Sequence, residues 1–347
     1  MREVYRILDA NFNRAREAVR VAEDFARFAL SDADLAGGFK NLRSMLQECY
    51  QRFPAPALLA ARDTGGDVGT AITSPTEMRR ADAASVAVAA CKRLTEALRT
   101  LEEYAKLALA EEAPKLEAMR YQAYQLEQRL GRRLSAGERL ANLRLYVLLT
   151  SRLCRRDVLE TAGLAIEGGA DAIQMREKDM PDRQRLELAR RLRELTARAG
   201  VLFIVNDRAD IAAAAGADGV HLGQDDLPPS AIRPLLPPRA LIGLSTHTLE
   251  QAKAAAGAGA DYIGVGPMFP TATKDAGPLA GPACLRAVLQ EVSLPAVAIG
   301  GITADNIDQL VAAGAKAVAV SSAVIAAEDP AAAARAIREK LPAGEQA

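Results

Sequence analysis

Charged and amide side chains recur in the C-terminal part of the chain directly after short apolar runs. Gln174, Arg176 and Lys178 follow one such run, and Asp207 and Asp226 follow the next two. Cations and polar groups of this kind suit a pyrophosphate group. Two carboxylates together with phosphate oxygens are the ligands by which proteins usually hold Mg²⁺. These residue types predict a site for a phosphorylated substrate and a divalent metal.

Two later apolar runs end in pairs of small residues. Gly300-Gly301 closes one and Ser321-Ser322 closes the next, each just before an expected helix. Backbone N–H groups at helix N-termini form the usual phosphate cradle of barrel enzymes. A Gly-Gly pair alone is also explained by a tight turn, but the Ser-Ser pair one strand later favours phosphate binding.

Each of these residues also has a plainer interpretation. A lone Lys or Arg is usually a solvated loop charge, and an Asp after a strand is often the N-cap of the next helix. His221 and His247 are the only two histidines, and neither has a Ser or Cys at a spacing that suggests a catalytic triad. We interpret His221 as a packing or hydrogen-bonding residue at a strand end and His247 as a residue near the first turn of a helix.

The elements that must position these residues are short β-branched or apolar runs that alternate with Ala-rich helical stretches. The expected strands are 144–150, 171–176, 201–207, 218–223, 240–246, 261–267, 295–301 and 316–322. Several are preceded by a Gly-Ala step, which suits a helix C-cap that leads directly into a strand. Eight regular strand–helix units in about 200 residues predict an α/β fold, a parallel (β/α)8 TIM barrel whose active site lies at the C-terminal ends of its strands. A doubly wound sheet is the alternative.

The first 130 residues follow a different pattern. Residues 14–30, 94–109 and 115–130 each place apolar residues on one stripe, with charges between them. We therefore predict an all-α helical-bundle domain over 1–130. The polar segment 131–142 is predicted to be a linker, and the barrel domain is expected to occupy 143–347.

The first two helical stretches resemble each other. A shift of 79 residues aligns Arg14 with Arg93, Glu17 with Glu96, Arg20 with Arg99, Glu23 with Glu102, and Ala26 with Ala105. Amphipathic helices of a bundle share such patterns because Ala, Leu, Glu and Arg are common helix formers. The other interpretation is an internal duplication that produces a pseudo-symmetric bundle.

Composition argues against several classes of protein. Lys plus Arg and Asp plus Glu both number 44, Trp is absent and aromatic residues are 4%, which disfavours nucleic-acid binding through basic patches or stacking platforms. No apolar run has the roughly 18 residues of a membrane span, and the charged N-terminus has no signal-peptide pattern. The four cysteines form no CxxC pair, so neither zinc nor disulfides are predicted. We expect a soluble cytoplasmic enzyme of small molecules, with homo-oligomerisation left open.

Seven motifs make the C-terminal part recognisable. QMREKD, IVNDRADIA, GVHLGQDDL, LSTHT, GPMFPTATK, IGGI and VSSAV occur in this order within residues 143–340. In these motifs the chain resembles the thiamine-phosphate synthase (thiamine-phosphate pyrophosphorylase) family of (β/α)8 barrels. The resemblance implies that hydroxymethylpyrimidine diphosphate is condensed with 4-methyl-5-(2-phosphoethyl)thiazole to give thiamine phosphate and pyrophosphate. Another phosphate-binding barrel enzyme, such as an isomerase, is the alternative.

The resemblance also implies a role for each residue at the rim. The pyrimidine diphosphate would be bound by Gln174, Met175, Arg176, Glu177, Lys178, Asn206, Ser245 and Lys274. The thiazole phosphate would be bound by Thr271, Ala272, Thr273, Gly301, Ser321 and Ser322. Mg²⁺ would be held by Asp207 and Asp226, with Asp225 not a ligand.

The chemistry that this implies needs no protein nucleophile. Arg176, Lys178 and Lys274 would be catalytic, because they and Mg²⁺ stabilise the negative charge that the leaving pyrophosphate gains. The electron-rich aminopyrimidine can carry the resulting methylene cation. The thiazole nitrogen then attacks that carbon.

The N-terminal part resembles the helical domain that is sometimes fused in front of this synthase and is associated with hydroxymethylpyrimidine phosphate kinase activity. ILDANFNRAREAVRVAEDFARF and the loop ARDTGGDVG (61–69) carry this likeness. It implies ATP and Mg²⁺ as further ligands, although no Walker A loop is present. A non-catalytic module for dimerisation or scaffolding is the alternative. A set of polar residues distinguishes the two. If their side chains are buried and converge, they mark a kinase site; if they are spread over the solvent-exposed surface, they form only a charged face. The residues are Asn11, Asn13, Arg14, Arg16, Arg20, Glu23, Asp24, Arg27, Arg62, Asp63 and Asp67.

Overall fold

The computed structural model describes residues 1–68, 79–271 and 278–342. The chain divides into two compact units, which we call the helical unit, Met1–Leu134, and the barrel unit, Ser135–Ala347. Among the described residues, no helix combines the length and apolar character required to cross a bilayer.

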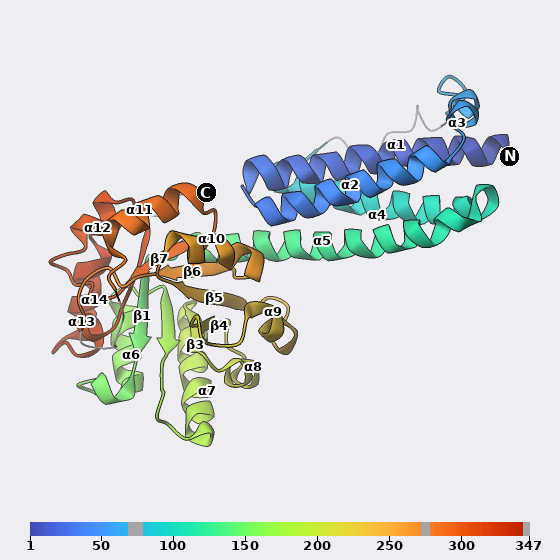
Figure 1. The fold of residues 1–347 in the computed structure, drawn as a ribbon. Coiled ribbons are helices and arrows are strands. Elements are labelled where there is room, and N and C mark those ends of the chain that lie inside the picture. Colours follow the sequence, from blue (N-terminus) through green and yellow to red (C-terminus); the bar gives the residue numbers. More distant parts are fainter. Residues whose placement is uncertain (69–78, 272–277, 343–347) are drawn as a thin grey trace. The chain divides into compact units, whose positions relative to one another are not determined.

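The helical unit is built from helices (Figure 1). In chain order they are α1 (Arg2–Asp24), the π-helix η1 (Phe25–Ala29), α2 (Ala33–Arg52), α3 (Ala55–Ala61), α4 (Ala83–Ala108), the 3-10 turn η3 (Ala110–Glu112) and α5 (Ala113–Leu140). The Asp32 side chain accepts a hydrogen bond from the Leu35 N–H, which caps α2. Asp82 and Ser85 form a capping box at the start of α4. The predicted all-α domain is confirmed, although α1 and α4 begin well before the predicted stretches 14–30 and 94–109.

The predicted linker 131–142 contains the boundary between the two units, which lies between Leu134 and Ser135, but it is helical over most of its length because α5 continues to Leu140. Arg, Leu and Glu in this segment are strong helix formers and outweigh Gly131 and Gly137. Ala136 and Leu140 are also buried, so the last turns of the helix have an apolar face to protect. Only residues 141–142 form a turn before the first strand.

The structure supports an internal duplication of the helical unit. Of the buried residues of α1 and η1, all but Asp9 have a buried counterpart in α4 at the shift of 79 residues. The following helices correspond at a shift of 77 residues. Phe39, Leu42, Leu46, Cys49 and Phe53 match Leu116, Met119, Ala123, Leu126 and Leu130, and all ten are buried. A shared burial pattern over two consecutive helices exceeds what general amphipathicity requires.

In the barrel unit, eight parallel strands of the described residues close into a barrel in sequence order. They are β1 (Leu145–Leu149), β2 (Ala172–Met175), β3 (Leu202–Asn206), β4 (Gly219–Leu222), β5 (Leu241–Thr246), β6 (Tyr262–Val265), β7 (Ala296–Ile299) and β8 (Ala317–Val320). Pairing of Leu145 in β1 with Val318 in β8 closes the sheet. The predicted TIM barrel is confirmed, and this pairing excludes an open doubly wound sheet.

Helices surround the strands (Figure 1). They are α6 (Val158–Glu167), α7 (Asp182–Ala199), α8 (Ala209–Ala215), α9 (Pro229–Ile232), α10 (Leu249–Ala258), α11 (Gly281–Glu291), α12 (Asp308–Ala312), α13 (Ser322–Ile325) and α14 (Pro330–Arg338). The Gly-Ala steps work as predicted: Gly169, Gly216, Gly259 and Gly314 have φ of 96°, 65°, 92° and 99°. This left-handed conformation suits glycine and turns the chain from helix to strand.

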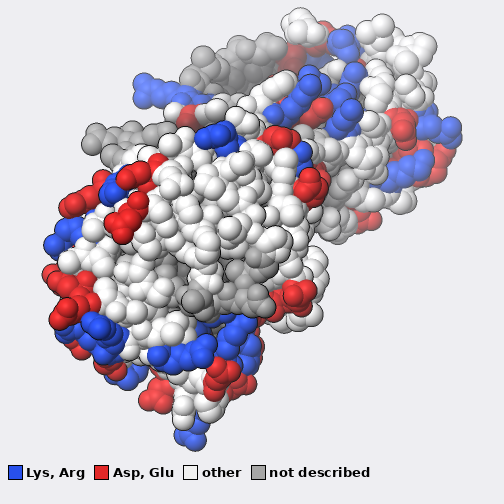
Figure 2. Space-filling model, turned by 60° about the vertical axis from the view of Figure 1, so that its left-hand side comes forward, with Lys and Arg blue, Asp and Glu red and all other residues white. Residues whose placement is uncertain are grey.

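Two apolar layers result from the alternation of side chains along the strands. One layer fills the space between strands and helices. The other includes Tyr146, Ile204 and Tyr262 from inside the barrel, and Ala136 and Leu140 of α5 pack against it. At the surface, the face drawn in Figure 2 shows Lys and Arg interspersed with Asp and Glu, without a continuous patch of either sign.

Candidate active site

A cavity of about 480 Å³ lies at the carboxyl ends of the barrel strands. Eight of the predicted rim residues line it, namely Gln174, Arg176, Asn206, Ser245, Thr271, Gly301, Ser321 and Ser322. They come from strands far apart in sequence, and the barrel brings them together because all its strands end at the same rim. Ala272, Thr273 and Lys274 lie outside the described residues.

A chain of hydrogen bonds connects polar side chains that line this cavity. Gln174 Nε2 donates to the Tyr146 hydroxyl at 2.8 Å, and the Tyr146 and Tyr262 hydroxyls are 3.0 Å apart. His221 bridges onward, with Nδ1 3.1 Å from the Tyr262 hydroxyl and Nε2 3.0 Å from Ser245 Oγ. Burial raises the pKa of both tyrosines, so their hydroxyls stay protonated. The chain fixes the orientation of Gln174 and Ser245, the two members that were predicted to bind substrate.

Glycines make room for these rings. A Cβ at Gly243 would lie 2.2 Å from Tyr262 Cζ and 2.4 Å from His221 Nδ1. A Cβ at Gly264 would lie 3.3 Å from His221 Cε1. Sequence reasoning gave His221 a hydrogen-bonding or packing role but missed both tyrosines, since nothing in the local sequence connects Tyr146 with Tyr262.

The two predicted metal ligands face each other at the rim. Asp207 follows β3 in a left-handed conformation, with φ of 62°, and its N–H donates to the His221 carbonyl at 2.8 Å. Asp226 accepts a hydrogen bond from the Gly223 N–H at 2.6 Å. Burial and the Asp226 carboxylate raise the pKa of Asp207 to about 6, while Lys178 and Arg176 oppose the rise. Two like charges held together in this way make a site that favours a cation.

This carboxyl pair fits a bound Mg²⁺. No group of three or more His, Cys, Asp and Glu side chains suited to a metal occurs within the described ranges. Mg²⁺ is commonly held by one or two carboxylates, with substrate phosphates and water as its other ligands. Asp207 and Asp226 are therefore a sufficient protein contribution if a phosphorylated substrate supplies the rest.

The segment after β2 places its predicted residues in three environments. The Met175 side chain is buried in the layer between strands and helices, so only its main chain faces the rim. Glu177 Oε1 accepts hydrogen bonds from the Ser151 N–H and Oγ, both at 2.6 Å. Lys178 lines a smaller depression that shares Arg176 with the main cavity. Thus Glu177 holds the loop after β1, while Arg176 stands between the two hollows and Lys178 lines only the smaller one.

The phosphate cradle differs from the prediction on one side. Gly300 and Gly301 have φ of 102° and 65°, and a Cβ at Gly301 would lie 2.5 Å from the Pro270 carbonyl oxygen. The chain then forms a turn in which the Asn306 side chain donates to the Gly301 carbonyl at 2.8 Å. A helix start directly after Gly301 is therefore wrong, because α12 begins only at Asp308. Backbone N–H groups of a glycine turn, not of a helix end, are presented here.

On the other side of the cradle, Ser322 is the first residue of the single-turn α13. Ser321 Oγ donates to the Leu148 carbonyl at 3.1 Å, which ties the end of β8 to β1. Both serines line the cavity.

The residues proposed for a kinase site do not all converge. Asn11 and Glu23 are buried, and Asn11 Nδ2 donates to the Ile7 carbonyl of its own helix. The Arg27 guanidinium lies over the exposed Phe28 ring at 4.8 Å. Arg62 binds the buried carboxylate of Asp9 through two hydrogen bonds of 2.8 Å.

Three of the proposed kinase residues do share a hollow. Asn13, Arg16 and Arg20 of α1 line a groove together with residues of α2 that sequence reasoning did not single out. Asp67, in contrast, does not line this groove.

The closed barrel and the cavity at the carboxyl ends of its strands, which polar side chains line in part, define an enzyme of the (β/α)8 class. A family model described as thiamine monophosphate synthase matches residues 145–324, and one described as the ThiD2 family matches residues 6–129. The thiamine-phosphate synthase of Nostoc punctiforme is 45% identical over 94% of this chain and 91% of its own length. That of Gloeobacter violaceus is 44% identical over 94% of each chain. The chain belongs to the thiamine-phosphate synthase family, whose enzymes act in thiamine biosynthesis.

A solved structure extends the comparison to the fold. The thiamine phosphate pyrophosphorylase from Pyrococcus furiosus has 42% identity and a TM-score of 0.55, and the match covers 58% of this chain and 96% of that chain. The family prediction made from the motifs is thereby confirmed, and the isomerase alternative for the barrel is no longer needed.

Proposed function

We propose that the barrel condenses hydroxymethylpyrimidine diphosphate with 4-methyl-5-(2-phosphoethyl)thiazole, releasing pyrophosphate and forming thiamine phosphate. The observation that carries this proposal is the facing carboxyl pair of Asp207 and Asp226 beside Arg176, at the rim of a cavity whose other side is formed by Gly301 and Ser322. One side has the charges to hold a diphosphate with its metal. The other has the backbone donors to hold a monophosphate, so the two substrates can face each other.

Each residue of the site has a role that depends on its distance from the leaving pyrophosphate, where negative charge develops. Arg176 and Lys178 are placed to neutralise the pyrophosphate as the carbon–oxygen bond breaks, and such stabilisation is worth most where charge grows in the transition state. Mg²⁺ held by Asp207 and Asp226 would supply further positive charge at the same oxygens. Gln174 and Ser245, fixed by the chain of buried hydrogen bonds, are positioned to hold the aminopyrimidine ring. The thiazole nitrogen then bonds to the methylene carbon.

Adjacent acidic residues allow a matched test. Asp226→Asn removes a proposed ligand, whereas Asp225→Asn changes an exposed neighbour. We expect Asp226→Asn to raise the Mg²⁺ requirement for thiamine phosphate formation by about 10–100-fold, and Asp225→Asn to leave it unchanged. Equal Mg²⁺ requirements in the two variants would remove Asp226 from the metal site.

We further propose that the helical unit makes the diphosphate by phosphorylating hydroxymethylpyrimidine phosphate with ATP. The match of the ThiD2 family model to residues 6–129 and the arginines and carboxylates of α1 support this function. A kinase needs cations for the transferred phosphate and carboxylates for Mg²⁺. A non-catalytic dimerisation or scaffolding module is the alternative.

The full chain can test the kinase function without interference from the barrel. If the thiazole phosphate is left out, the diphosphate has no partner and accumulates. We expect ADP and hydroxymethylpyrimidine diphosphate to appear in equal amounts from ATP and the monophosphate. A chain that forms thiamine phosphate from supplied diphosphate but makes no ADP would leave the scaffold function standing.

A further inference from the structure

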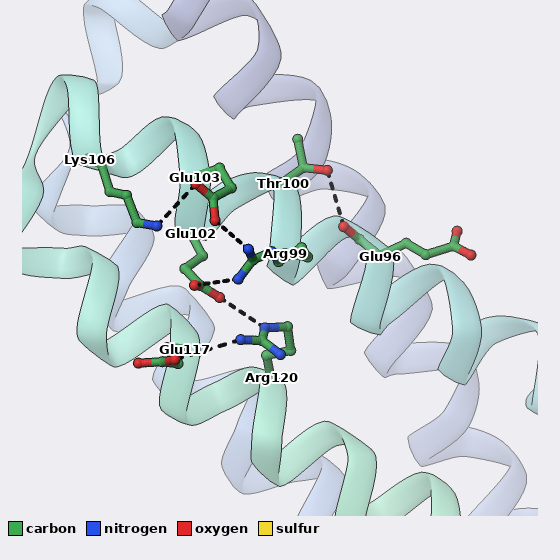
Figure 3. A network of polar contacts seen from close by, with 8 residues as sticks. All are labelled: Glu96, Arg99, Thr100, Glu102, Glu103, Lys106, Glu117 and Arg120. Carbon is green, nitrogen blue, oxygen red and sulfur yellow. Dashed lines mark hydrogen bonds and ion pairs between the residues drawn. The ribbon is translucent and has the colours of Figure 1, made fainter.

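The duplicated halves of the helical unit carry the same network of ion pairs. In the second half, Glu102 accepts hydrogen bonds from Arg99 at 2.8 Å and from Arg120 of the next helix at 2.9 Å (Figure 3). In the first half, Glu23 accepts one from Arg43 Nε of the next helix at 2.6 Å, and Arg20 lies 3.9 Å away. Both glutamates are buried. The network therefore belongs to the duplicated framework.

The two copies differ in what covers the network. In the second half, the rings of Tyr121 and Tyr124 lie over Arg120 at 4.7 and 5.8 Å, and the Arg120 side chain is only 9% exposed. Ser44 and Gln47 occupy the corresponding positions of the first half at the shift of 77 residues. Small and flexible side chains thus replace two aromatic rings.

In the first half, a groove lies at the place that corresponds to the two tyrosines of the second half. The Arg43 side chain is 35% exposed there. The groove has a volume of about 640 Å³ and runs between α1 and α2. Its lining consists of Asn13, Arg16, Glu17, Arg20, Arg43, Ser44, Gln47, Glu48 and Gln51.

The chemistry of this lining suits a phosphorylated ligand. Hydrogen bonds to Glu23 use Nε and Nη2 of Arg43, and a guanidinium has five N–H donors, so Arg43 retains donors for a second anion. Arg16 lies over the Tyr50 ring at 5.5 Å, which orients a second guanidinium at the groove. A planar guanidinium group can donate two parallel hydrogen bonds to two oxygens of one phosphate. Amide side chains such as Gln47 and Gln51 both donate and accept hydrogen bonds, as a heterocycle requires.

The groove is also continuous with the polar end of α1. Asp9, Asn13, Arg16 and Arg20 follow one another at intervals of three or four residues, which places them on one stripe of the helix. Asp9 is the buried position of α1 without a buried counterpart in α4, where Val88 stands in its place and is 39% exposed. Departures from the duplicated pattern therefore gather along this stripe of the first half.

We propose that the groove between α1 and α2 is the ligand site of the helical unit, and that Arg16 and Arg43 bind the phosphate of a phosphorylated small molecule there. The choice of ligand rests on the kinase function proposed above: it is either ATP or the phosphorylated pyrimidine. The second copy kept the framework and lost the site when tyrosines closed it.

The duplication itself supplies the test. Ser44→Tyr/Gln47→Tyr fills the groove with the residues of the closed copy, and Tyr121→Ser/Tyr124→Gln is the reciprocal control. Binding of ATP and of hydroxymethylpyrimidine phosphate to the full chain is measured by calorimetry, each separately, with the barrel saturated by thiamine phosphate and pyrophosphate. We expect the filled variant to lose binding of at least one ligand by about tenfold or more, the loss of one charge-assisted contact, while the control stays near the native affinity.

A smaller change keeps the test decisive if the filled variant does not fold. Arg16→Ala removes an exposed guanidinium whose contact among the described residues is the Tyr50 ring. We expect it to weaken binding by about tenfold as well. Lys40→Ala on α2 removes an exposed cation outside the groove and serves as the charge-matched control. Thermal unfolding checks that each variant remains folded.

The outcomes separate the site from the function. Loss of ATP binding alone, or of pyrimidine phosphate binding alone, supports the groove and identifies its ligand. Loss of binding in a chain that makes no ADP supports the groove but overturns the kinase. ADP formation and ligand affinities that survive both groove variants overturn the groove and leave the kinase standing. A native chain that binds neither ligand overturns the groove.

Discussion

The carboxyl pair at the barrel rim predicts a specific pH dependence of Mg²⁺ use. Burial and Asp226 raise the pKa of Asp207 to about 6, so a proton competes with the metal for this carboxylate below that pH. Raising the pH therefore strengthens Mg²⁺ binding until Asp207 is fully ionised. Asp226→Asn removes one of the two main causes of the raised pKa, and burial remains.

The size of the effect follows from the titration. With a pKa of about 6, roughly a tenth of Asp207 is ionised one pH unit below it, so apparent Mg²⁺ affinity falls about tenfold between pH 7 and pH 5. In Asp226→Asn the midpoint moves to lower pH, because the like charge is gone. Loss of the ligand weakens Mg²⁺ binding at every pH, by about 10–100-fold. A merely structural role for Asp226 would not move the midpoint.

The assay is thiamine phosphate formation at subsaturating Mg²⁺, followed from about pH 5 to about pH 8 with supplied diphosphate. Asp225→Asn is the control, and we expect it to keep the native midpoint and Mg²⁺ requirement. An Asp226→Asn enzyme with an unchanged midpoint would refute the electrostatic coupling of the pair. An unchanged Mg²⁺ requirement would refute its role as a ligand.

Three further outcomes follow from the site. Lys274→Ala is expected to lower the rate of bond formation in single-turnover kinetics more than it raises the thiazole phosphate requirement, because its charge matters most as pyrophosphate leaves; a change in that requirement alone would reassign Lys274 to ground-state binding. Tyr262→Phe breaks hydrogen bonds to Tyr146 and His221 and should lower the free energy of unfolding by about 1–3 kcal/mol in denaturant titrations; unchanged stability would show that the buried chain contributes little. Gly301→Ala should weaken thiazole phosphate binding by at least about tenfold, since its Cβ would lie 2.5 Å from the Pro270 carbonyl oxygen; a native requirement for that substrate would exclude the glycine turn from the cradle.

Much of the barrel could be predicted from sequence because its rules are local. Each strand is a short β-branched or apolar run, and each Gly-Ala step marks a helix end. The observed strands lie within the predicted ranges, as with β3, 202–206 against 201–207. The rim residues could be found because all strands of a parallel barrel end at the same rim, so any residue that directly follows a predicted strand is expected there.

What escaped prediction depends on contacts between distant segments. Tyr146 and Tyr262 are 116 residues apart, and each alone is an ordinary aromatic residue of a strand. The groove of the helical unit needs Arg16 and Arg43 from two helices, and the repeat shift changes from 79 to 77 residues between them. The helical conformation of the segment 131–142 was missed because two glycines were given more weight than the helix formers and the apolar contacts around them.

The most direct test of the whole account is product analysis of the full chain given hydroxymethylpyrimidine phosphate, thiazole phosphate, ATP and Mg²⁺. We expect thiamine phosphate, ADP and pyrophosphate in equal amounts, because one unit makes the diphosphate that the other consumes. Thiamine phosphate that appears only when the diphosphate is supplied would contradict the role given to the helical unit. No thiamine phosphate even with supplied diphosphate would contradict the central claim about the barrel.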